Sequence, residues 1–369
     1  MKVLVTGGAG FIGSHTTDLL LERGHKVKIL DSLAQPTHKG PPCYLPQEAE
    51  FIKGDVRSED DLRRALEDTE VVFHLAAAGG YGLESKEYLE VNTLATAQML
   101  EIIAEGFPGV EKIIVASSVA VYGEGKYRCP DDGEFYPEPR GLEELAKGEW
   151  EMKCPECGGE AEPQPVSEEG KVSPASPYAL SKYDQERLVL NFGREQKIPT
   201  VALRYFLTYG PRQSLLNPYT GVTSIFATRI INGLPPVVYE DGRQKRDFIF
   251  VEDVAEANLY VMESDSLDGQ AVNIGSGRAT SILDLALALA QALGKKITPE
   301  LRGEYRPFDV RHIFADTTKL EAAGFQAKTG LEQGLGKFLD WLARQGEIKE
   351  YFTEAEKAMR KKGIIQQAK

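Results

Sequence analysis

A tyrosine and a lysine in the stretch SPYALSK have the types and the spacing for acid–base chemistry. Tyr178 and Lys182 are four residues apart, so on a helix they lie one above the other on the same face. A phenol with an ordinary pKa of about 10 is a poor base at neutral pH, but a neighbouring ammonium group stabilises the phenolate and lowers that pKa. The spacing by itself is common in surface helices, so its meaning depends on the rest of the chain.

The glycine-rich stretch VTGGAGFIGSH predicts a dinucleotide site. Gly7, Gly10 and Gly13 lie between the first predicted strand and the first predicted helix. Glycines there allow a tight turn and a close approach of the backbone to a pyrophosphate. Asp31 ends the second predicted strand, and no arginine is near it in LDSLAQ. A carboxylate at that place binds ribose hydroxyls and repels a 2′-phosphate, which predicts NAD rather than NADP.

Three further stretches are expected at the same edge of the sheet. Asp55 follows the third predicted strand and could bind adenine, with a plain turn aspartate as the alternative. The small residues of HLAAAGG follow the fourth strand and let the chain pass close to a cofactor, whereas His74 itself is more typical of a packed strand residue. The serines of VASSVAVYG end the fifth strand, where a hydroxyl would face the same crevice as the glycine turn.

The elements that must position these residues alternate between strand and helix. This alternation predicts an α/β fold with a Rossmann-type, doubly wound parallel sheet across residues 1–203. Part of 247–275 is expected to return to that domain, and residues 204–369 are expected to form mainly a smaller α/β substrate-binding lobe, ending in a solvated terminal helix. The expected strands are Val3–Val5, Val27–Leu30, Phe51–Ile52, Val71–Leu75, Ile113–Ala116 and Thr200–Leu203, and the expected helices are Ile12–Arg23, Glu59–Glu67, Tyr88–Glu105 and Tyr178–Arg194.

An insertion over about 124–175 interrupts the alternation and carries three of the four cysteines. Cys154 and Cys157 form a C-x-x-C knuckle, and Cys129 with Asp132 has the matching spacing, so the four could hold a structural zinc ion. Cys43 or a histidine could supply the fourth ligand instead. The alternative is an ordinary Pro/Gly-rich loop with free thiols. Catalytic zinc is not expected, since the residues above already account for redox chemistry.

Charge and composition narrow the class of protein. The formal net charge is −13, so no broad basic face is expected for nucleic acid or an anionic membrane. The most apolar long stretch, Ile282–Leu293, is too short to span a bilayer and contains Asp284. The chain starts directly on the first predicted strand, and four cysteines in 369 residues suit a reducing compartment. These features predict a cytoplasmic protein.

With these motifs in place, the chain resembles the extended short-chain dehydrogenase/reductases, specifically the nucleotide-sugar epimerases and dehydratases. The resemblance covers nearly the whole chain. It rests on TGGAGFIG, LDSL, GDV, HLAA, VNTLAT, SSVAVYG, YALSK, RYFLTYGPR, RDFIFVEDVAEA, NIGSG and RPFDVRHIFAD. It implies NAD as the cofactor, a nucleotide-diphosphate sugar as the substrate, and a homodimer paired through the helices near Asn92–Glu105 and Tyr178–Arg194.

The resemblance also implies roles for individual residues. Ser118 would be the catalytic hydroxyl, Tyr178 the acid and base, and Lys182 the group that tunes it. Asn92 would support the lysine and the cofactor, and Arg246 and Arg306 would hold the nucleotide diphosphate. The remaining implied cofactor contacts, beyond Gly7, Gly10, Gly13, Asp31 and Asp55, are Phe11, Ile12, Val56, Leu75, Ala76 and Ala77.

Departures from the family pattern narrow the expected reaction. The family's dehydratases place an Asp-Glu pair after the catalytic hydroxyl residue, whereas Val119 and Ala120 stand here, which favours epimerisation at C4 through a 4-keto intermediate. Leu207 replaces a common asparagine, and Phe308 replaces the usual glycine of an R-x-G-D element. Both changes weaken the assignment of the substrate more than that of the reaction.

Several alternatives stay open at this point. The insertion and stretches such as GPRQSLLNPYTGV are most similar to the branch of dTDP-L-rhamnose 4-epimerases, with UDP-hexose 4-epimerases as close competitors. A reductase or decarboxylase could use the same serine, tyrosine and lysine. A nucleotide-sensing protein without catalysis is a third hypothesis.

Overall fold

A seven-stranded parallel sheet forms the larger part of the molecule in the computed structural model, which describes residues 1–35, 37–38, 40–80, 84–215 and 221–369. The strand order is β13-β9-β5-β4-β1-β2-β3, and every neighbouring pair is parallel. The direction of winding reverses between β1 and β4, which opens a crevice at their carboxyl ends. The strands are β1 Lys2–Thr6, β2 Lys26–Asp31, β3 Glu50–Lys53, β4 Val71–His74, β5 Lys112–Ser118, β9 Thr200–Tyr205 and β13 Gln270–Ile274.

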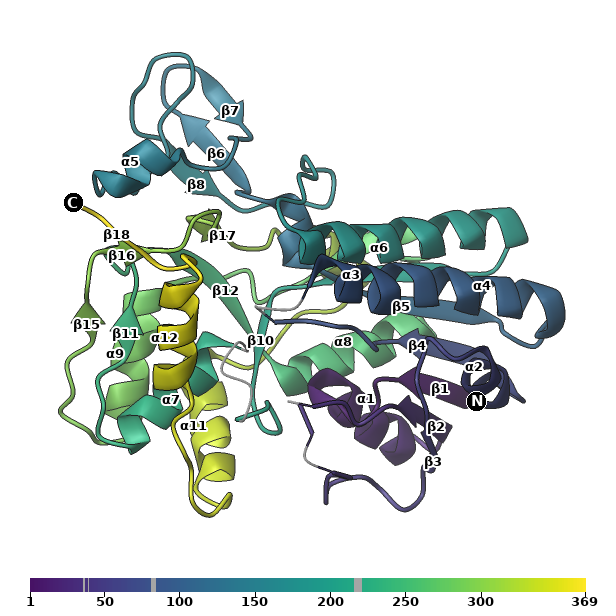
Figure 1. The fold of residues 1–369 in the computed structure, drawn as a ribbon. Coiled ribbons are helices and arrows are strands. Elements are labelled where there is room, and N and C mark those ends of the chain that lie inside the picture. Colours follow the sequence, from purple (N-terminus) through teal and green to yellow (C-terminus); the bar gives the residue numbers. More distant parts are fainter. Residues whose placement is uncertain (36, 39, 81–83, 216–220) are drawn as a thin grey trace.

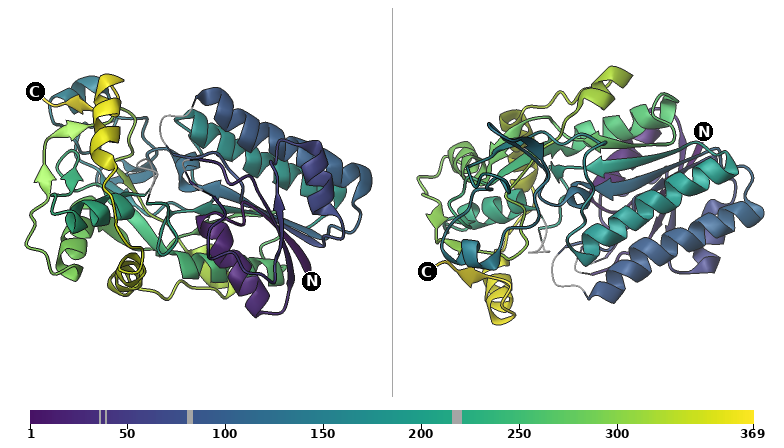
Figure 2. Two further views of the ribbon diagram at one scale, coloured as in Figure 1. Left: turned by 60° about the horizontal axis from the view of Figure 1, so that its bottom comes forward. Right: turned by 90° about the horizontal axis from the view of Figure 1, so that it is seen from above.

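Helices cover both faces of this sheet, as Figures 1 and 2 show. Leu20, Val254 and Leu320 belong to the apolar core on one face, and Leu62, Met99 and Val189 to the core on the other. Strands buried on both sides explain the nearly continuous apolar runs of the sequence. The first face carries α1 Phe11–Glu22, α8 Val251–Glu263 and α10 Thr318–Ala323, and the second carries α2 Glu59–Leu66, α4 Ala95–Gly106 and α6 Pro177–Gln196. The prediction of a Rossmann-type doubly wound sheet is confirmed.

The helix expected over Tyr88–Glu105 is not one regular helix. It consists of α3 Ser85–Tyr88, a π-helical turn η1 Leu89–Leu94, and α4. Single π-turns inside α-helices are often found at functional sites, and this one carries Asn92.

A smaller lobe packs beside the carboxyl edge of the large sheet (Figure 1). Its own core gathers apolar side chains such as Phe226, Leu285 and Phe338. Five residues of GPRQSLLNPYTGV, 216–220, lie outside the described residues. The lobe has one sheet of β10 Leu207–Tyr209, β12 Lys245–Phe250, β14 Ala279–Ser281 and β17 His312–Ile313, two strand pairs, β11 Val237–Val238 with β15 Glu300–Leu301 and β16 Glu304–Tyr305 with β18 Gln366–Gln367, and helices α7 Val222–Ile231, α9 Ile282–Ala292, α11 Leu331–Leu342 and α12 Phe352–Lys361.

The insertion forms a small unit of its own that projects from the rest of the molecule (Figure 1). It begins after the 3₁₀ turn η2 Val119–Tyr122. Its core is only Tyr127, Met152 and Ala161, with Phe135 packed against them. It contains the antiparallel sheet β7-β6-β8, with β6 Lys126–Cys129, β7 Gly133–Phe135 and β8 Glu162–Gln164, and the short helix α5 Leu142–Ala146.

The expectation of a solvated terminal element is wrong. Phe352, Met359 and Ile365 are buried against Val237 of the lobe, and the final strand β18 pairs with β16. Most charged residues of α12 lie on its outer face, which is why the local sequence resembles a free amphipathic helix. Glu356 is the buried exception and pairs with Arg302 at 2.9 Å. Within the described residues, no helix is both long and apolar enough to cross a bilayer.

Candidate active site

The glycine turn after β1 packs directly against the loop after β4. Gly7 has a φ of 70°, and a Cβ atom on it would lie 2.8 Å from the amide nitrogen of Ala76. A Cβ atom on Gly13 would lie 2.2 Å from the carbonyl oxygen of Gly7. Neither distance is possible for a real Cβ, so side chains at these two positions would push the turn away from the sheet.

The N-terminus of α1 is arranged to receive an anion. Gly10 is the N-cap, and no side chain caps the helix, so the N–H groups at Phe11 and Ile12 belong to a first turn with no capping acceptor. Asp31 is held beside this turn, because its carboxylate accepts N–H groups from Ala9 at 3.0 Å and Leu33 at 2.9 Å. This donor and acceptor set fits the pyrophosphate and ribose of NAD.

The other predicted cofactor residues surround the same crevice. Leu75 and Ala76 donate N–H groups to the backbone and side chain of Thr6, which ties the loop containing Ala77 to β1. Val56 is buried. The Asp55 carboxylate forms a two-point ion pair with Arg57, with a shortest distance of 2.6 Å, and this pairing lowers the pKa of Asp55. Asp55 therefore lies after β3, as predicted, and its carboxylate already has an ion-pair partner within the protein.

Ser118 and Tyr178 meet across the sheet edge. Ser118 ends β5, and Tyr178 lies in the first turn of α6, which starts at a Ser176 cap with Pro177 in its first turn. Burial raises the pKa of Tyr178, and a hydrogen bond with the Ser118 hydroxyl acts in the opposite direction. The Tyr88 ring packs edge-on against Tyr178, with their centroids 5.8 Å apart.

The nucleotide turn and the acid–base helix share one loop. A Cβ atom on Gly79 would lie 3.8 Å from the Tyr178 ring. The same loop, a few residues earlier, contacts Gly7 through Ala76. The loop after β4 therefore brings the predicted pyrophosphate site and the phenol to one crevice.

Lys182 is 2% exposed, and burial lowers its pKa to about 7. Its ammonium group donates to the side-chain oxygen of Gln185. Asn92 supports the same region, since its amide donates to the Ser181 hydroxyl at 2.9 Å and its oxygen accepts the N–H of Ala78 at 2.8 Å. Asn92 thus joins the loop after β4 to the helix that carries Lys182.

A buried polar chain that the sequence reasoning missed continues from Lys182. Gln185 donates to Thr96 at 2.9 Å, and Thr96 is 2.9 Å from His74, which is 2.9 Å from Thr6. Burial, together with the charge of Lys182, lowers the pKa of His74 to about 3, so this histidine is a neutral, packed residue as expected. Gln185 could have been found from its i+3 spacing to Lys182 on the same helix.

A buried ion pair anchors α6 to the sheet. The Arg204 guanidinium on β9 donates to both carboxylate oxygens of Glu186 on α6, at 2.6 and 3.0 Å. The Ser117 hydroxyl on β5 donates to the same carboxylate at 2.8 Å. Glu186 lies one turn beyond Lys182 and Ser117 directly precedes Ser118. The ion pair therefore sets the register between the acid–base helix and the strand that carries the hydroxyl.

The two predicted diphosphate-binding arginines share one carboxylate in the lobe. Arg306 bonds Asp309 at 2.6 and 3.1 Å, and Arg246 lies 3.4 Å from the other oxygen of Asp309. Burial raises the pKa of Asp309, but the two arginines outweigh it and hold the pKa below its usual value. Sequence reasoning did not single out Asp309, although it stands in the same motif as Arg306.

The two departures from the family pattern lie in the same lobe. Phe308 has a φ of 64°, a conformation that favours glycine, and its side chain is 65% exposed. A glycine at this position would adopt this positive φ without strain. Phe308 adopts it with its ring exposed. Leu207 opens β10, beside Phe248 of β12.

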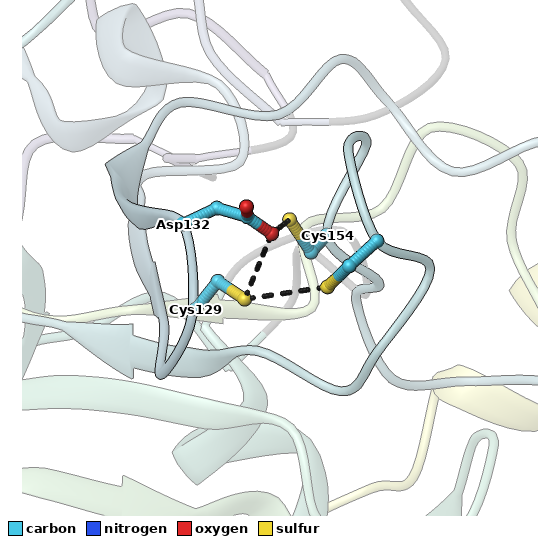
Figure 3. Close-up of side chains that lie close together, drawn as sticks. Cys129, Asp132 and Cys154 are labelled. Carbon is cyan, nitrogen blue, oxygen red and sulfur yellow. Dashed lines mark hydrogen bonds between the residues drawn. The ribbon is translucent and has the colours of Figure 1, made fainter.

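The four residues singled out as metal ligands converge in the insertion, as Figure 3 shows for the labelled three. The Sγ atom of Cys129 is 3.5 Å from that of Cys157, and the Asp132 carboxylate is 3.1 Å from the Sγ of Cys154. The ligand atoms of all four lie within 4.8 Å of one another. Cys43, the alternative ligand, is exposed and is not in this group.

We predict that the stability contributed by residue 182 depends on pH. The folded pKa of Lys182 is about 7, well below the unfolded value, so the unfolded chain binds more protons between pH 7 and about 10.4. The free energy of unfolding of the cofactor-free protein, relative to Lys182→Met, should therefore rise by about 2 kcal/mol from pH 7 to 9. Urea unfolding of both proteins at these pH values measures the difference, and a flat or falling difference would contradict the buried charge.

Known proteins resemble this chain along most of its length. The chain matches the NAD dependent epimerase/dehydratase family over residues 3–141 and 155–275. It is 33% identical to dTDP-L-rhamnose 4-epimerase of Burkholderia thailandensis over 356 residues, which are 93% of this chain and 95% of that protein.

Solved structures of similar proteins share the fold. UDP-glucose 4-epimerase from Thermotoga maritima, with UDP-glucose, has a TM-score of 0.78 and 31% identity, covering 94% of this chain and 100% of that one. UDP-glucuronic acid 4-epimerase from Bacillus cereus, with UDP-glucuronic acid and NAD, has a TM-score of 0.75 and 28% identity, covering 93% and 99%.

The family match is interrupted over residues 142–154, which lie in the insertion and include the first cysteine of the C-x-x-C knuckle. The insertion is therefore partly outside the common family pattern, whereas the glycine turn, β5 and α6 are inside it. The match covers more than half of the chain, and this protein belongs to the NAD dependent epimerase/dehydratase family.

Proposed function

We propose that this protein is an NAD-dependent epimerase that inverts C4 of a nucleotide-diphosphate sugar. Two observations carry the proposal: Ser118 is close enough to Tyr178 to act on its pKa, and the loop packed against the glycine turn also contacts the Tyr178 ring. Residues 1–203, with 247–275, would bind the cofactor, and the lobe of 204–369 would bind the substrate. Arg246 and Arg306 would neutralise the diphosphate.

The protein's own groups would move one proton in each half of the cycle. The Tyr178 phenolate takes the proton of the sugar C4 hydroxyl, and Ser118 donates a hydrogen bond to the same sugar oxygen. Bound NAD, held by the glycine turn and Asp31, would supply the hydride-transfer chemistry at C4. Tyr178 then returns its proton to the C4 oxygen. No proton, hydride or electron is gained or lost overall, so no added reductant is needed.

For Tyr178 to act as a base, the pKa of its phenol has to fall. Burial raises the pKa of Tyr178, and Lys182 is directed to Gln185. The positive charge of the bound nicotinamide, together with a protonated Lys182, would lower the pKa of the phenol. Binding of NAD is therefore a condition for activating the base.

We propose dTDP-L-rhamnose as the substrate, on the similarity to the relative from Burkholderia thailandensis. Dehydration is disfavoured because Val119 and Ala120, which follow the catalytic hydroxyl, carry no acid or base.

We also propose that Cys129, Asp132, Cys154 and Cys157 hold one structural zinc ion. Tetrahedral ligands placed about 2.0–2.3 Å from zinc lie roughly 3.3–3.8 Å apart. Three of the separations between these ligand atoms, 3.1 to 3.5 Å, are close to that range, and all four atoms lie within 4.8 Å of one another. Three thiolates and one carboxylate form a closed set without an open position, which fits a structural rather than a catalytic ion.

A homodimer in the cytoplasm completes the proposal. Leu94, at the end of η1, and Leu180, on α6, are 61% and 46% exposed on two helical segments that pack side by side. Exposed leucines on adjacent helices suit burial against a second copy. All four cysteines are free of disulfides, which suits a reducing compartment. Fractionation of the native cells would check the compartment.

The acid–base role predicts a large loss for Tyr178→Phe. Epimerisation of dTDP-L-rhamnose, followed by NMR without added NAD(P)H, should slow by about 10²–10⁴-fold because the proton acceptor is gone. Bound NAD, measured after denaturation, should be unchanged. Tyr183→Phe, on the same helix, is the control and should retain turnover. Full activity in Tyr178→Phe would refute the mechanism, and a requirement for added NAD(P)H would favour a reductase.

The zinc proposal predicts about one zinc ion per chain by elemental mass spectrometry of the purified protein. Cys154→Ser should lose the ion and lower the melting temperature, because the insertion has little core of its own. Cys43→Ser is the matched control and should retain both. A metal-free wild-type protein with unchanged stability after chelator treatment would refute the site.

The dimer proposal predicts a mass near twice 40.7 kDa by light scattering. Leu94→Glu should shift the protein towards the monomer, because a charge would be buried at the interface. Leu142→Glu, at an exposed position of the insertion, should leave the mass unchanged. A monomeric wild-type protein would contradict the proposal.

A further inference from the structure

One segment of the lobe lies between the insertion and the two arginines assigned to the diphosphate. This segment, Asp309–His312, is called the bridge segment below. It passes from the loop that contains Arg306 into β17, which pairs with Arg246 of β12. Its contacts on the two sides connect parts of the chain that are far apart in sequence.

On the lobe side, the bridge segment holds both arginines. The Arg246 guanidinium donates to the carbonyl oxygens of Arg311, at 3.0 Å, and Val310. Asp309 bonds Arg306 at 2.6 Å. The direction of both guanidinium groups therefore depends on where the bridge segment lies.

On the insertion side, Arg140 holds the start of the bridge segment. Its guanidinium donates to the carbonyl oxygen of Asp309 at 2.7 Å and to both carboxylate oxygens of Glu240 at 2.9 and 3.0 Å. Arg140 and Glu240 are both buried. A buried two-point pair of this kind fixes geometry as well as charge.

Glu151 of the insertion holds the other end of the bridge segment. One carboxylate oxygen accepts from Arg311, which is fully buried, and the other is 2.9 Å from the His312 ring. Arg311 also bonds Glu240 at 2.8 Å. Glu151 is thus one of three insertion residues in a cluster that otherwise belongs to the lobe. The others are Arg140 and Glu124, whose carboxylate accepts the N–H of Arg311 at 2.8 Å.

The position of Glu151 depends in turn on the metal knuckle. It stands three residues before Cys154, on a segment joined to the knuckle by hydrogen bonds from Cys154 to Gly159, at 2.7 Å, and from Ala161 to Met152, at 3.1 Å. Beneath it lies only the small core around Tyr127 and Met152. With so little apolar burial, the four ligands would restrain this segment, together with the hydrogen bond from Arg140 to the Trp150 carbonyl oxygen at 3.1 Å.

We propose that the metal-bearing insertion positions Arg246 and Arg306 for the nucleotide diphosphate, with Glu151 and Arg140 as positioning residues that act through the bridge segment. This inference rests on the proposed function for the role of the two arginines. It makes a site remote from the cofactor a determinant of substrate affinity. The crevice with Tyr178 and Lys182 takes no part in these contacts.

Glu151→Gln is the sharpest test, because the Glu151 side chain is 38% exposed and the variant should still fold. Glutamine keeps the size and removes one of the three carboxylates paired with Arg311, and the one that pairs with His312; Glu240 and Asp241 still hold Arg311. We expect KM for dTDP-L-rhamnose to rise about 10-fold, with kcat changed less than about 2-fold. Glu149→Gln, two residues away and paired only with Lys153 at the surface, is the control and should leave both constants unchanged.

Hydrogen exchange followed by mass spectrometry gives a readout that needs no substrate. In Glu151→Gln, and in Cys154→Ser, exchange should be faster over residues 305–313 and unchanged over Gly7–Gly13 and the first turns of α6. Unchanged exchange over 305–313 in both variants would overturn the inference, as would a fall in kcat at constant KM. An inactive wild-type protein would refute the proposed activity alone, since the exchange result stands without turnover.

Discussion

The buried ion pair between Glu186 and Arg204 fastens α6, the helix that carries Tyr178 and Lys182, to the sheet. A buried pair of this kind adds little net stability, but loss of one partner strands a charge at a cost of about 3–5 kcal/mol. Its value here is geometric. Glu186 also accepts from Ser117, so a single carboxylate joins α6, β5 and β9. This contact helps to hold Tyr178 of α6 beside Ser118 of β5.

Lys182 shows how the protein keeps a buried cation without an acid beside it. Its ammonium bonds the neutral amide of Gln185, and the chain continues through Thr96 to His74. The neutral amide accepts a hydrogen bond but leaves the buried charge uncompensated, so burial lowers the pKa of Lys182 to about 7. A lysine near its titration point can respond to a bound cofactor, whereas a firmly salt-bridged lysine would not.

The insertion is held in place in a different way, because it is too small to bury a large apolar core. Tyr127, Met152 and Ala161 form its one small core cluster among the described residues, and a few separate side chains such as Leu145 are also buried. It is held at one end by four converging metal-type ligands and at the other by ion pairs with the lobe. The insertion and the residues around Arg246 are therefore linked by one continuous set of contacts.

The sequence alone determined what depends on local spacing. The glycine turn, the Tyr178–Lys182 pair, the βαβ alternation and the metal-type residues Cys129 and Cys154 each follow from residue types a few positions apart. Tertiary structure decided what depends on contacts between distant segments: the Gln185–Thr96–His74 chain, the sharing of Asp309, and the burial of α12. No local pattern encodes these contacts, because burial and pairing are set by which surfaces meet when the chain packs.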